Sequence, residues 1–346
     1  MNIVILDDFQ DTIRKLPCAT LLDTHTAKVY TNNVKGVGQL AIRLRDAEVV
    51  VLTHQRTSIT RPLIDKLPKL RLVVQTGPSQ DNIDIAACTE RGILVVGGTG
   101  APHAIAELTW GLIMSSTRRI PQYVAHLKHG AWQQSGMKAQ AMPTNFCIGS
   151  LLRGKVLGLW SDDLAQQHTS VGHLVAGFGR AFGMRVLVWG NAQARAYAAQ
   201  NGFEVATSKE SILDISDVLT LHPTYSKGQA ALLSLADLSR MKPSALLVNT
   251  TNAGLIGADA LIGALNRGRP GSAAVDVFDT EPPAPSHTLM RLENCLSTPH
   301  IGAVEIDTLD SDYAAAFATI EAYARGAPVH EINPLARTNI ADVSPK

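Results

Sequence analysis

The stretch that decides the fold is "GKVLGLWSDDLAQQHTSVGHLVAGFGRAFGMRVLVWG", residues 154–190. Apolar runs near its two ends predict buried strands, and the apolar spacing after residue 170 predicts a helix between them. A strand, a tight loop and a helix open a nucleotide-binding α/β domain, in which glycines usually form the loop. The loop at 161–170 contains no glycine. The stretch therefore predicts a nucleotide domain with a remodelled phosphate loop.

Similar apolar runs, separated by helix-length segments, continue on both sides of this stretch and predict parallel sheets. The expected strands lie in 2–8, 47–53, 70–77 and 92–96, and then in 156–160, 184–190, 203–206, 217–223, 244–251, 272–278 and 295–300. A long helical pattern at 101–130, broken at Pro121, would connect two domains. A second helical pattern at 303–326 would pack back on the N-terminal part.

We therefore expect an α/β protein of two doubly wound parallel-sheet domains. A Rossmann dinucleotide-binding domain, residues 104–302, would be inserted into a flavodoxin-like substrate domain formed by residues 1–103 and 303–346. Ligands would bind in the cleft between the two domains.

Composition excludes several classes of partner. The 31 basic and 30 acidic residues form no long run of one sign, which argues against nucleic acid and membrane surfaces as partners. The four cysteines lack C-x-x-C spacing, so we expect no metal site. No basic leader and no apolar run of about 18 residues is present, which predicts a cytoplasmic protein. A small-molecule partner fits this composition best.

Three stretches together resemble the D-isomer-specific 2-hydroxyacid dehydrogenase family, which includes phosphoglycerate and glyoxylate/hydroxypyruvate reductases. They are 151–190, "MKPSALLVNTTNAGLI" at 241–256, and "AAVDVFDTEP" with "LENCLSTPHIG" between 273 and 302. Residues 75–96 and 106–119 also fit the family. The resemblance implies hydride transfer between a nicotinamide cofactor and C2 of a small 2-oxo acid or D-2-hydroxy acid. It also implies a homodimer.

The resemblance assigns catalytic roles to His300 and Glu281. His300, in "STPHIG", matches the family's acid/base histidine, and a histidine that titrates near neutrality suits protonation of the developing alkoxide. Glu281, in "DTEP", matches the carboxylate that pairs with this histidine, raises its affinity for a proton and fixes its tautomer.

The third catalytic position departs from the family. In "NTTNAG", Asn252 stands where the family has an arginine that binds the substrate's carboxylate and carbonyl. Losing such a charge-assisted contact costs on the order of 2 to 4 kcal/mol, or roughly a hundred- to a thousandfold in rate. Ordinary 2-oxo acid reduction should therefore be weak.

Two accounts of Asn252 remain open. In the first, the substrate is a 2-imino acid, supplied by a partner oxidase and reduced to a D-amino acid, because a neutral asparagine would not repel a protonated imine. In the second, the chain is a catalytically degenerate binding protein with weak or no cofactor binding. Retention of both His300 and Glu281 favours the first account.

Substrate contacts are expected from the first domain. Arg56, in "LTHQRTSI", follows a strand and could bind a carboxylate in place of the missing arginine. The resemblance places the family's carboxylate-binding loop at Thr76, Gly77, Pro78 and Ser79.

The phosphate loop is longer than the family pattern. Fourteen residue steps separate Gly158 from Gly172 where the family has eight, and Gly172 alone survives of the loop glycines. Ser170, Val171 and Gly172 could still present helix N-terminal amides to a pyrophosphate. Asp162 and Asp163 would repel it unless the longer loop turns them away.

The end of the next strand bears on the choice of cofactor. NAD-binding members usually have an acid there, whereas this chain has Gly190, Asn191 and then Arg195. The missing acid and the nearby arginine favour NADP(H) over NAD(H). From the resemblance, further cofactor contacts are expected at His222, Pro223, Thr250, Asp276 and Gly302.

Overall fold

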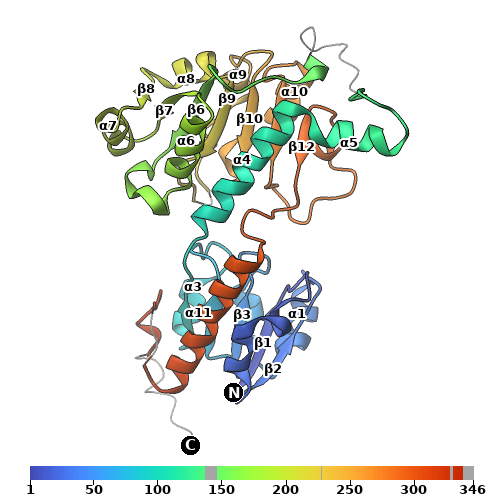
Figure 1. The fold of residues 1–346 in the computed structure, drawn as a ribbon. Coiled ribbons are helices and arrows are strands. Elements are labelled where there is room, and N and C mark those ends of the chain that lie inside the picture. The colour runs from blue at the N-terminus through green and yellow to red at the C-terminus, as the bar shows by residue number, and fades with distance from the viewer. Residues whose placement is uncertain (137–145, 227, 328–329, 338–346) are drawn as a thin grey trace, which may run out of the picture. The chain divides into compact units, whose positions relative to one another are not determined.

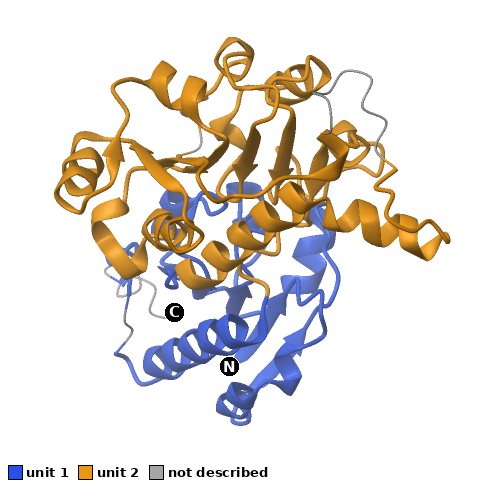
Figure 2. Ribbon diagram, turned by 45° about the horizontal axis from the view of Figure 1, so that its top comes forward, with its two compact units in different colours: residues 1–100, 305–346 blue, residues 101–304 orange. Residues whose placement is uncertain are grey.

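The computed structural model describes residues 1–136, 146–226, 228–327 and 330–337. The chain forms two compact units, shown in blue and orange in Figure 2: unit 1 is Met1–Gly100 with Glu305–Lys346, and unit 2 is Ala101–Val304. The sequence placed these divisions at 103/104 and 302/303. Residues 338–346 of the predicted substrate domain lie outside the described residues.

Unit 1 contains a five-stranded parallel sheet in the order β2-β1-β3-β4-β5. This is the doubly wound order of flavodoxin-like domains. Figure 1 labels strands β1, β2 and β3 of this sheet. The strands are β1 (Asn2–Leu6), β2 (Thr26–Val29), β3 (Val49–Leu52), β4 (Leu72–Gln75) and β5 (Leu94–Val96). The four predicted strands are confirmed. The sequence missed β2, because this edge strand is mostly exposed and carries no apolar run.

The helices of unit 1 cover both faces of its sheet. They are α1 (Val37–Leu44), α2 (Arg61–Ile64), α3 (Ile85–Glu90) and α11 (Ile306–Ala324), with short 3₁₀ turns η1 (Ile13–Lys15) and η2 (Pro17–Leu22). Tyr313 and Phe317 of α11 are fully buried against Ile3 and Ile5 of β1 and Val49 of β3. The expected return of the C-terminal helix to the N-terminal sheet is confirmed.

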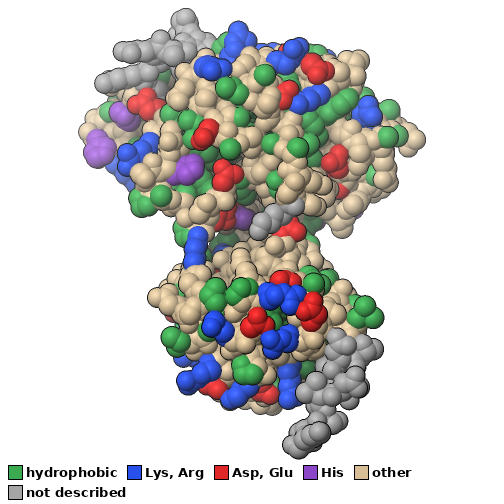
Figure 3. All heavy atoms as spheres, turned by 180° about the vertical axis from the view of Figure 1, so that it is seen from behind, with side chains coloured by type: hydrophobic (Ala, Val, Ile, Leu, Met, Phe, Trp, Pro, Cys, Tyr) green, Lys and Arg blue, Asp and Glu red, His purple; other side chains and the backbone are tan. Residues whose placement is uncertain are grey.

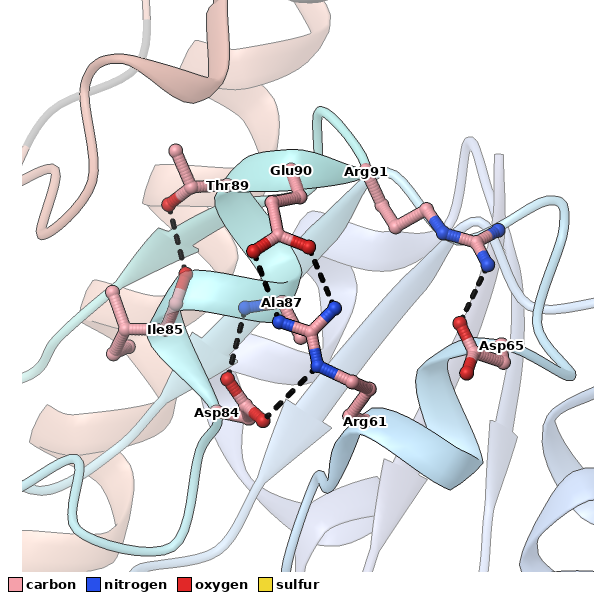
Figure 4. Close-up of polar contacts among 8 residues, drawn as sticks. All are labelled: Arg61, Asp65, Asp84, Ile85, Ala87, Thr89, Glu90 and Arg91. Atoms are coloured by element: carbon pink, nitrogen blue, oxygen red, sulfur yellow. Dashed lines mark hydrogen bonds and ion pairs between the residues drawn. The ribbon is translucent and has the colours of Figure 1, made fainter.

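Ion pairs join the two short helices α2 and α3, as Figure 4 shows. The Arg61 guanidinium donates to both carboxylate oxygens of Glu90, at 2.6 and 3.0 Å. Asp84 caps α3 by accepting from the amide of Ala87. Because these side chains are about half exposed, we expect the pairs to orient the two helices more than to stabilise them.

Unit 2 contains a seven-stranded parallel sheet in the order β12-β11-β10-β9-β6-β7-β8. The order runs outward in both directions from β6 and β9, as in dinucleotide-binding Rossmann domains. The strands are β6 (Val156–Ser161), β7 (Arg185–Trp189), β8 (Glu204–Val205), β9 (Val218–His222), β10 (Leu246–Asn249), β11 (Ser272–Val275) and β12 (Cys295–Ser297). All seven were predicted.

The helices of unit 2 are α4 (Pro102–Arg118), α5 (Ile120–Lys128), α6 (Val171–Ala181), α7 (Ala192–Gln200), α8 (Lys209–Ile215), α9 (Leu235–Leu238) and α10 (Ala260–Asn266). Short 3₁₀ turns are η3 (Phe146–Ile148), η4 (Leu164–Thr169), η5 (Ala253–Leu255) and η6 (Thr288–Met290). The predicted break at Pro121 is wrong by two residues. Arg119, with φ 58°, ends α4, while Pro121 lies in the first turn of α5, where a proline is tolerated.

Charged side chains of both signs are intermingled on the face drawn in Figure 3. Within the described residues, no helix is both long and apolar enough to span a bilayer. Those residues also contain no cluster of three or more histidine, cysteine or acidic side chains suited to a metal ion.

Candidate functional site

His300 and Glu281 form a hydrogen-bonded pair in unit 2. His300 Nδ1 lies 2.6 Å from Glu281 Oε2, and Glu281 Oε1 accepts from the amide of Phe278 at 3.0 Å. The carboxylate therefore holds the imidazole in the tautomer that carries hydrogen on Nδ1, which makes Nε2 the ring atom able to exchange a proton. The His300 side chain is 49% exposed, so a ligand can reach it.

A buried aspartate shapes the backbone that carries His300. Asp276, at the end of β11, is 0% exposed and accepts three hydrogen bonds: from Thr298 Oγ1, Ile301 N and Gly302 N. His300 lies inside this clasp with φ 53°, which is unusual for a residue other than glycine. Asp276 and Gly302, expected as cofactor contacts, thus help to position the backbone of His300.

Asn252 caps the short turn η5. Its Oδ1 accepts from the amide of Gly254 at 2.8 Å, and Asn249 binds its backbone on both sides. One lone pair of the amide oxygen is therefore used locally, and the Nδ2 group makes no hydrogen bond to the described residues. This group is a hydrogen-bond donor. The sequence did not foresee that the substitution also creates a cap, a role that arginine does not fill.

The glycine-free segment between β6 and α6 folds onto unit 2. Leu164 is fully buried in the core, which anchors η4. Asp163 Oδ1 accepts from the hydroxyls of Ser161 and Ser170, at 2.8 and 2.9 Å. Because Ser170 is the N-cap residue of α6, a carboxylate lies beside the helix terminus where a phosphate would bind. The longer loop does not turn Asp163 away.

The three residues predicted to bind the pyrophosphate differ in what they offer. Ser170 is fully buried, and its hydroxyl accepts from His173 N in addition to its bond with Asp163. No hydrogen bond to the amides of Val171 and Gly172 occurs among the described residues. Gly172 packs so closely that an added Cβ would lie 2.5 Å from Ser161 Oγ. The two amides stay the predicted phosphate donors.

The end of β7 receives an acid from another segment. Asp162 Oδ1 accepts from the amide of Asn191 at 2.9 Å, and Asn191 Nδ2 donates to the Asp162 carbonyl at 3.0 Å. The guanidinium of Arg195 lies 4.8 Å above the Trp189 ring. The preference for NADP(H) rested on the absence of an acid here, and Asp162 removes that premise. The preference for NADP(H) stays a prediction from the sequence.

The other predicted cofactor contacts lie at the carboxyl ends of β9 and β10. His222 is buried, with its Nε2 2.8 Å from Thr220 Oγ1, and burial lowers its pKa to about 3. It is therefore neutral at physiological pH. Pro223 is also buried. The hydroxyls of Thr250 and Thr109 lie 2.7 Å apart and join β10 to α4, which gives Thr250 a packing role.

The predicted substrate residues belong to unit 1 and are described within it. Arg56 Nη1 donates to the Asp7 carbonyl at 2.7 Å, and its guanidinium lies 4.7 Å above the Phe9 ring. Much of Arg56 therefore packs inside unit 1. Thr76 Oγ1 accepts from the amide of His54 at 3.0 Å. Gly77 is buried, whereas Pro78 is exposed and Ser79 is partly exposed.

His54 is a candidate that the sequence analysis missed. It follows β3, has φ 51°, and its Nε2 lies 3.8 Å from Asp312 Oδ2 of α11. Gly77 of the predicted carboxylate-binding loop lies beside the same imidazole. The signal was its position two residues before Arg56, at the carboxyl end of a parallel strand, where ligands of doubly wound sheets bind.

The residues of unit 2 fit a nicotinamide dinucleotide with one opposing charge. The strand order, the amides of Val171 and Gly172, and the close approach at Gly172 match the general requirements of such a site. Asp163 opposes it, because a carboxylate beside α6 repels a pyrophosphate. The site would hold the dinucleotide with reduced affinity.

These features define an α/β protein with a dinucleotide-binding domain and a histidine–carboxylate pair. Residues 110–302 match the family model of the D-isomer specific 2-hydroxyacid dehydrogenase NAD-binding domain. The chain belongs to the D-isomer-specific 2-hydroxyacid dehydrogenase family, as the resemblance implied.

Similar proteins are known by sequence and by structure. The D-3-phosphoglycerate dehydrogenase of Methanocaldococcus jannaschii is 34% identical over 77% of this chain and 47% of its own length. The glyoxylate reductase of Aeropyrum pernix is 32% identical over 82% of this chain and 81% of its own length. The chain thus spans about half of the first relative but most of the second.

Two solved structures share the fold over nearly the whole chain. One from Ralstonia solanacearum is 50% identical, with a TM-score of 0.93, and covers 97% of this chain and 98% of that chain. A phosphoglycerate oxidoreductase from Vibrio cholerae O395 is 36% identical, with a TM-score of 0.87, and covers 94% and 100%.

Proposed function

We propose that this protein reduces a small 2-oxo acid to a D-2-hydroxy acid with a nicotinamide dinucleotide, at a low rate. The observation that carries the proposal is the His300–Glu281 pair, joined at 2.6 Å and held in place by the buried Asp276. The named activities of the relatives, phosphoglycerate dehydrogenase and glyoxylate reductase, support the same reaction class.

The residues divide the work of carbonyl reduction. When bound, the cofactor supplies the hydride that adds to the carbonyl carbon. His300 Nε2 gives a proton to the carbonyl oxygen, which completes the hydroxyl group. Glu281 fixes the imidazole orientation and balances the charge of the protonated ring. Val171 and Gly172 offer amides to the phosphates.

Asn252 favours an oxo acid over an imino acid as substrate. Its amide oxygen already accepts from Gly254 N, whereas its Nδ2 group donates to none of the described residues and can donate to a ligand. A carbonyl oxygen accepts from such a donor, whereas a protonated imine is itself a donor and needs an acceptor. The imino acid account, which drew on the loss of the arginine, therefore receives no support from the orientation of this amide.

The test is a product analysis. Purified protein is incubated with NADH or NADPH and a panel of small 2-oxo acids, with and without an amino-acid oxidase that supplies 2-imino acids. We expect D-2-hydroxy acids as products in both arms, with formation lost in H300Q. Formation of D-amino acids in the oxidase arm alone would reject the oxo acid proposal in favour of the imino one.

A second candidate function is a binding protein that has lost cofactor-dependent chemistry. The observation that favours it is the Asp163 carboxylate beside the N-terminus of α6. Titration with NADH separates the two candidates. The enzyme proposal predicts measurable binding that becomes tighter in D163N, because removal of the carboxylate removes repulsion. No binding at millimolar NADH by either protein would favour the second candidate.

Three further expectations remain predictions from the sequence. They are the homodimer, the supply of substrate by a partner oxidase, and the cytoplasmic location.

A further inference from the structure

The end of β7 cannot carry its own ribose-binding acid. In dinucleotide-binding domains an acid at the end of the second strand binds the ribose hydroxyls of NAD. In unit 2 that position follows Trp189 and is Gly190. A Cβ built on Gly190 would lie 2.0 Å from the Ser161 carbonyl oxygen, so no side chain fits there. The approach of the β6 end to the β7 end imposes this restriction.

The next residue, Asn191, is committed to local structure. Its Oδ1 accepts from Ala194 N at 2.8 Å and thereby caps α7. Its Nδ2 group donates to the carbonyl of Asp162. Gly190 and Asn191 therefore provide neither a negative charge nor a side-chain acceptor that is not already in use.

Asp162 brings a carboxylate to this position from the lengthened segment after β6. Its Oδ1 accepts from the backbone amide of Asn191 at 2.9 Å. Together with the bond from Asn191 Nδ2 to its carbonyl, this contact fixes Asp162 at both backbone and side chain. Oδ2 makes no hydrogen bond to the described residues, and the residue is partly exposed. One carboxylate oxygen can thus accept from a ligand hydroxyl.

Arg195 is the residue that would favour NADP(H) instead, because a guanidinium near this strand end can bind a 2′-phosphate. The guanidinium carbon of Arg195 lies 4.8 Å from the centre of the Trp189 ring. Its Nε is buried and has no hydrogen-bond partner among the described residues. Stacking holds Arg195 on the side chain of β7, whereas Asp162 is bound to the backbone at the position of the missing acid. A 2′-phosphate there would meet a fixed carboxylate.

We propose that Asp162 is the ribose-binding acid of this chain and that it selects NAD(H) over NADP(H). The extra residues between β6 and α6 thereby restore a function that Gly190 cannot provide. This inference rests on the proposed function, since it requires a dinucleotide to bind unit 2.

Titration of the full-length protein with NADH and with NADPH, followed by calorimetry, tests the proposal. The variant is D162N, which keeps an oxygen for the Asn191 amide and removes the charge. We expect the wild type to bind NADH at least tenfold more tightly than NADPH, and D162N to reduce this ratio at least tenfold. D214N, an exposed acid paired with Arg240 elsewhere in unit 2, is the matched control and should keep the ratio.

Two further results would overturn the assignment. A wild-type preference for NADPH that R195Q abolishes would assign the selection to Arg195 and leave the dehydrogenase function intact. A ratio in D162N equal to that of the wild type would show that Asp162 does not contact the ribose. Cooperative thermal melting shows that the wild type and D162N are folded. If both proteins are folded and neither binds NADH or NADPH at millimolar concentration, the proposed function fails together with this inference.

Discussion

At the scale of single residues, the buried side chain of Asp276 holds the backbone on which His300 lies. It binds the backbone on the C-terminal side of His300 and the hydroxyl of Thr298 on the other side. Removing one partner from a buried hydrogen-bonded charge lowers stability by several kcal/mol, so we expect substitutions of Asp276 to destabilise unit 2. His300 and Glu281 can remain paired only while this backbone keeps its form.

Asn252 leads to the first prediction. We expect N252R to raise kcat/KM for small 2-oxo acids by about 10- to 100-fold, because arginine restores a fixed charge and a bidentate grip. The variant also loses the cap on Gly254, at a cost of about 1 kcal/mol in stability. Steady-state kinetics measure the gain. N252A loses the cap without adding a charge and should show no gain; an equal gain in N252A would contradict the prediction.

His222 leads to a prediction about pH. Burial lowers the pKa of His222 from 6.5 to about 3. As the pH falls, His222 is therefore protonated near pH 6.5 in the unfolded chain but only near pH 3 in the folded chain. The stability due to the neutral ring is therefore present above pH 6.5 and lost as the pH falls. When the pH falls from 7 to 5, the free energy of unfolding of H222N should therefore decrease by about 2 kcal/mol less than that of the wild type.

Urea unfolding at several pH values measures this difference. The H222N amide can still bind Thr220, so the comparison isolates the titration of the ring. H103N, at an exposed position in α4, controls for the loss of a histidine. If the free energies of unfolding of H222N and the wild type change in parallel with pH, the pKa of His222 is not lowered in the folded chain.

At the scale of elements, the junction of β6 and α6 depends on a close approach. A Cβ at Gly172 would lie 2.5 Å from Ser161 Oγ and 2.7 Å from Ser161 Cβ. We therefore expect G172A to lower the free energy of unfolding by about 1 to 3 kcal/mol through overpacking. Gly177, on the same helix, has open space around it. G177A should gain up to about 1 kcal/mol, since alanine favours helix over glycine. Thermal melting of the two variants should shift in opposite directions.

Elements with strong local signals could be predicted from the sequence. Buried strands such as β3, with four consecutive fully buried residues, carry apolar runs that reveal them. The edge strand β2 carries no such run, and its pairing with β1 depends on the rest of the sheet. Arg119, where α4 ends, donates from its guanidinium to the carbonyl of Phe146, which lies 27 residues further along the chain and is brought there by folding.

The site was predictable to the same degree. His300 and Glu281 were found because short family motifs carry them, and their 2.6 Å contact agrees with the predicted pairing. The positions of Asp162 and Asp163 could not be predicted, because each depends on a partner brought by folding: Asn191 at the end of β7, and Ser170 at the start of α6. A lengthened loop has no family pattern from which to infer such contacts.

At the scale of the whole molecule, the chain leaves unit 1 at residue 100 and returns to it at residue 305. The returning helix α11 buries Tyr313 and Phe317 against the five-stranded sheet, and Asn333 binds the backbone of Ile93 and Val95. Unit 2 holds its own two core clusters around the seven-stranded sheet. Unit 1 thus depends on both ends of the chain, whereas unit 2 is continuous.

This organisation predicts different fates for two fragments. Residues 101–304 alone should unfold cooperatively, because their core is complete. In residues 1–304 the sheet of unit 1 lacks α11 and exposes a large apolar face, so the amides of β1, β3 and β4 should lose protection from hydrogen exchange. The amides of β6, β9 and β10 should stay protected. Equal protection of both sheets in the longer fragment would contradict the prediction.

The central claim is that the chain reduces a 2-oxo acid by hydride transfer with His300 as the proton donor. The most direct test is a reaction with NADH that carries deuterium at C4 of the nicotinamide, in each of the two stereochemical positions. The claim predicts deuterium at C2 of a D-2-hydroxy acid from one of the two labelled cofactors, with formation at least a hundredfold slower in H300Q. Unlabelled product from both cofactors, or an equal rate in H300Q, would contradict it.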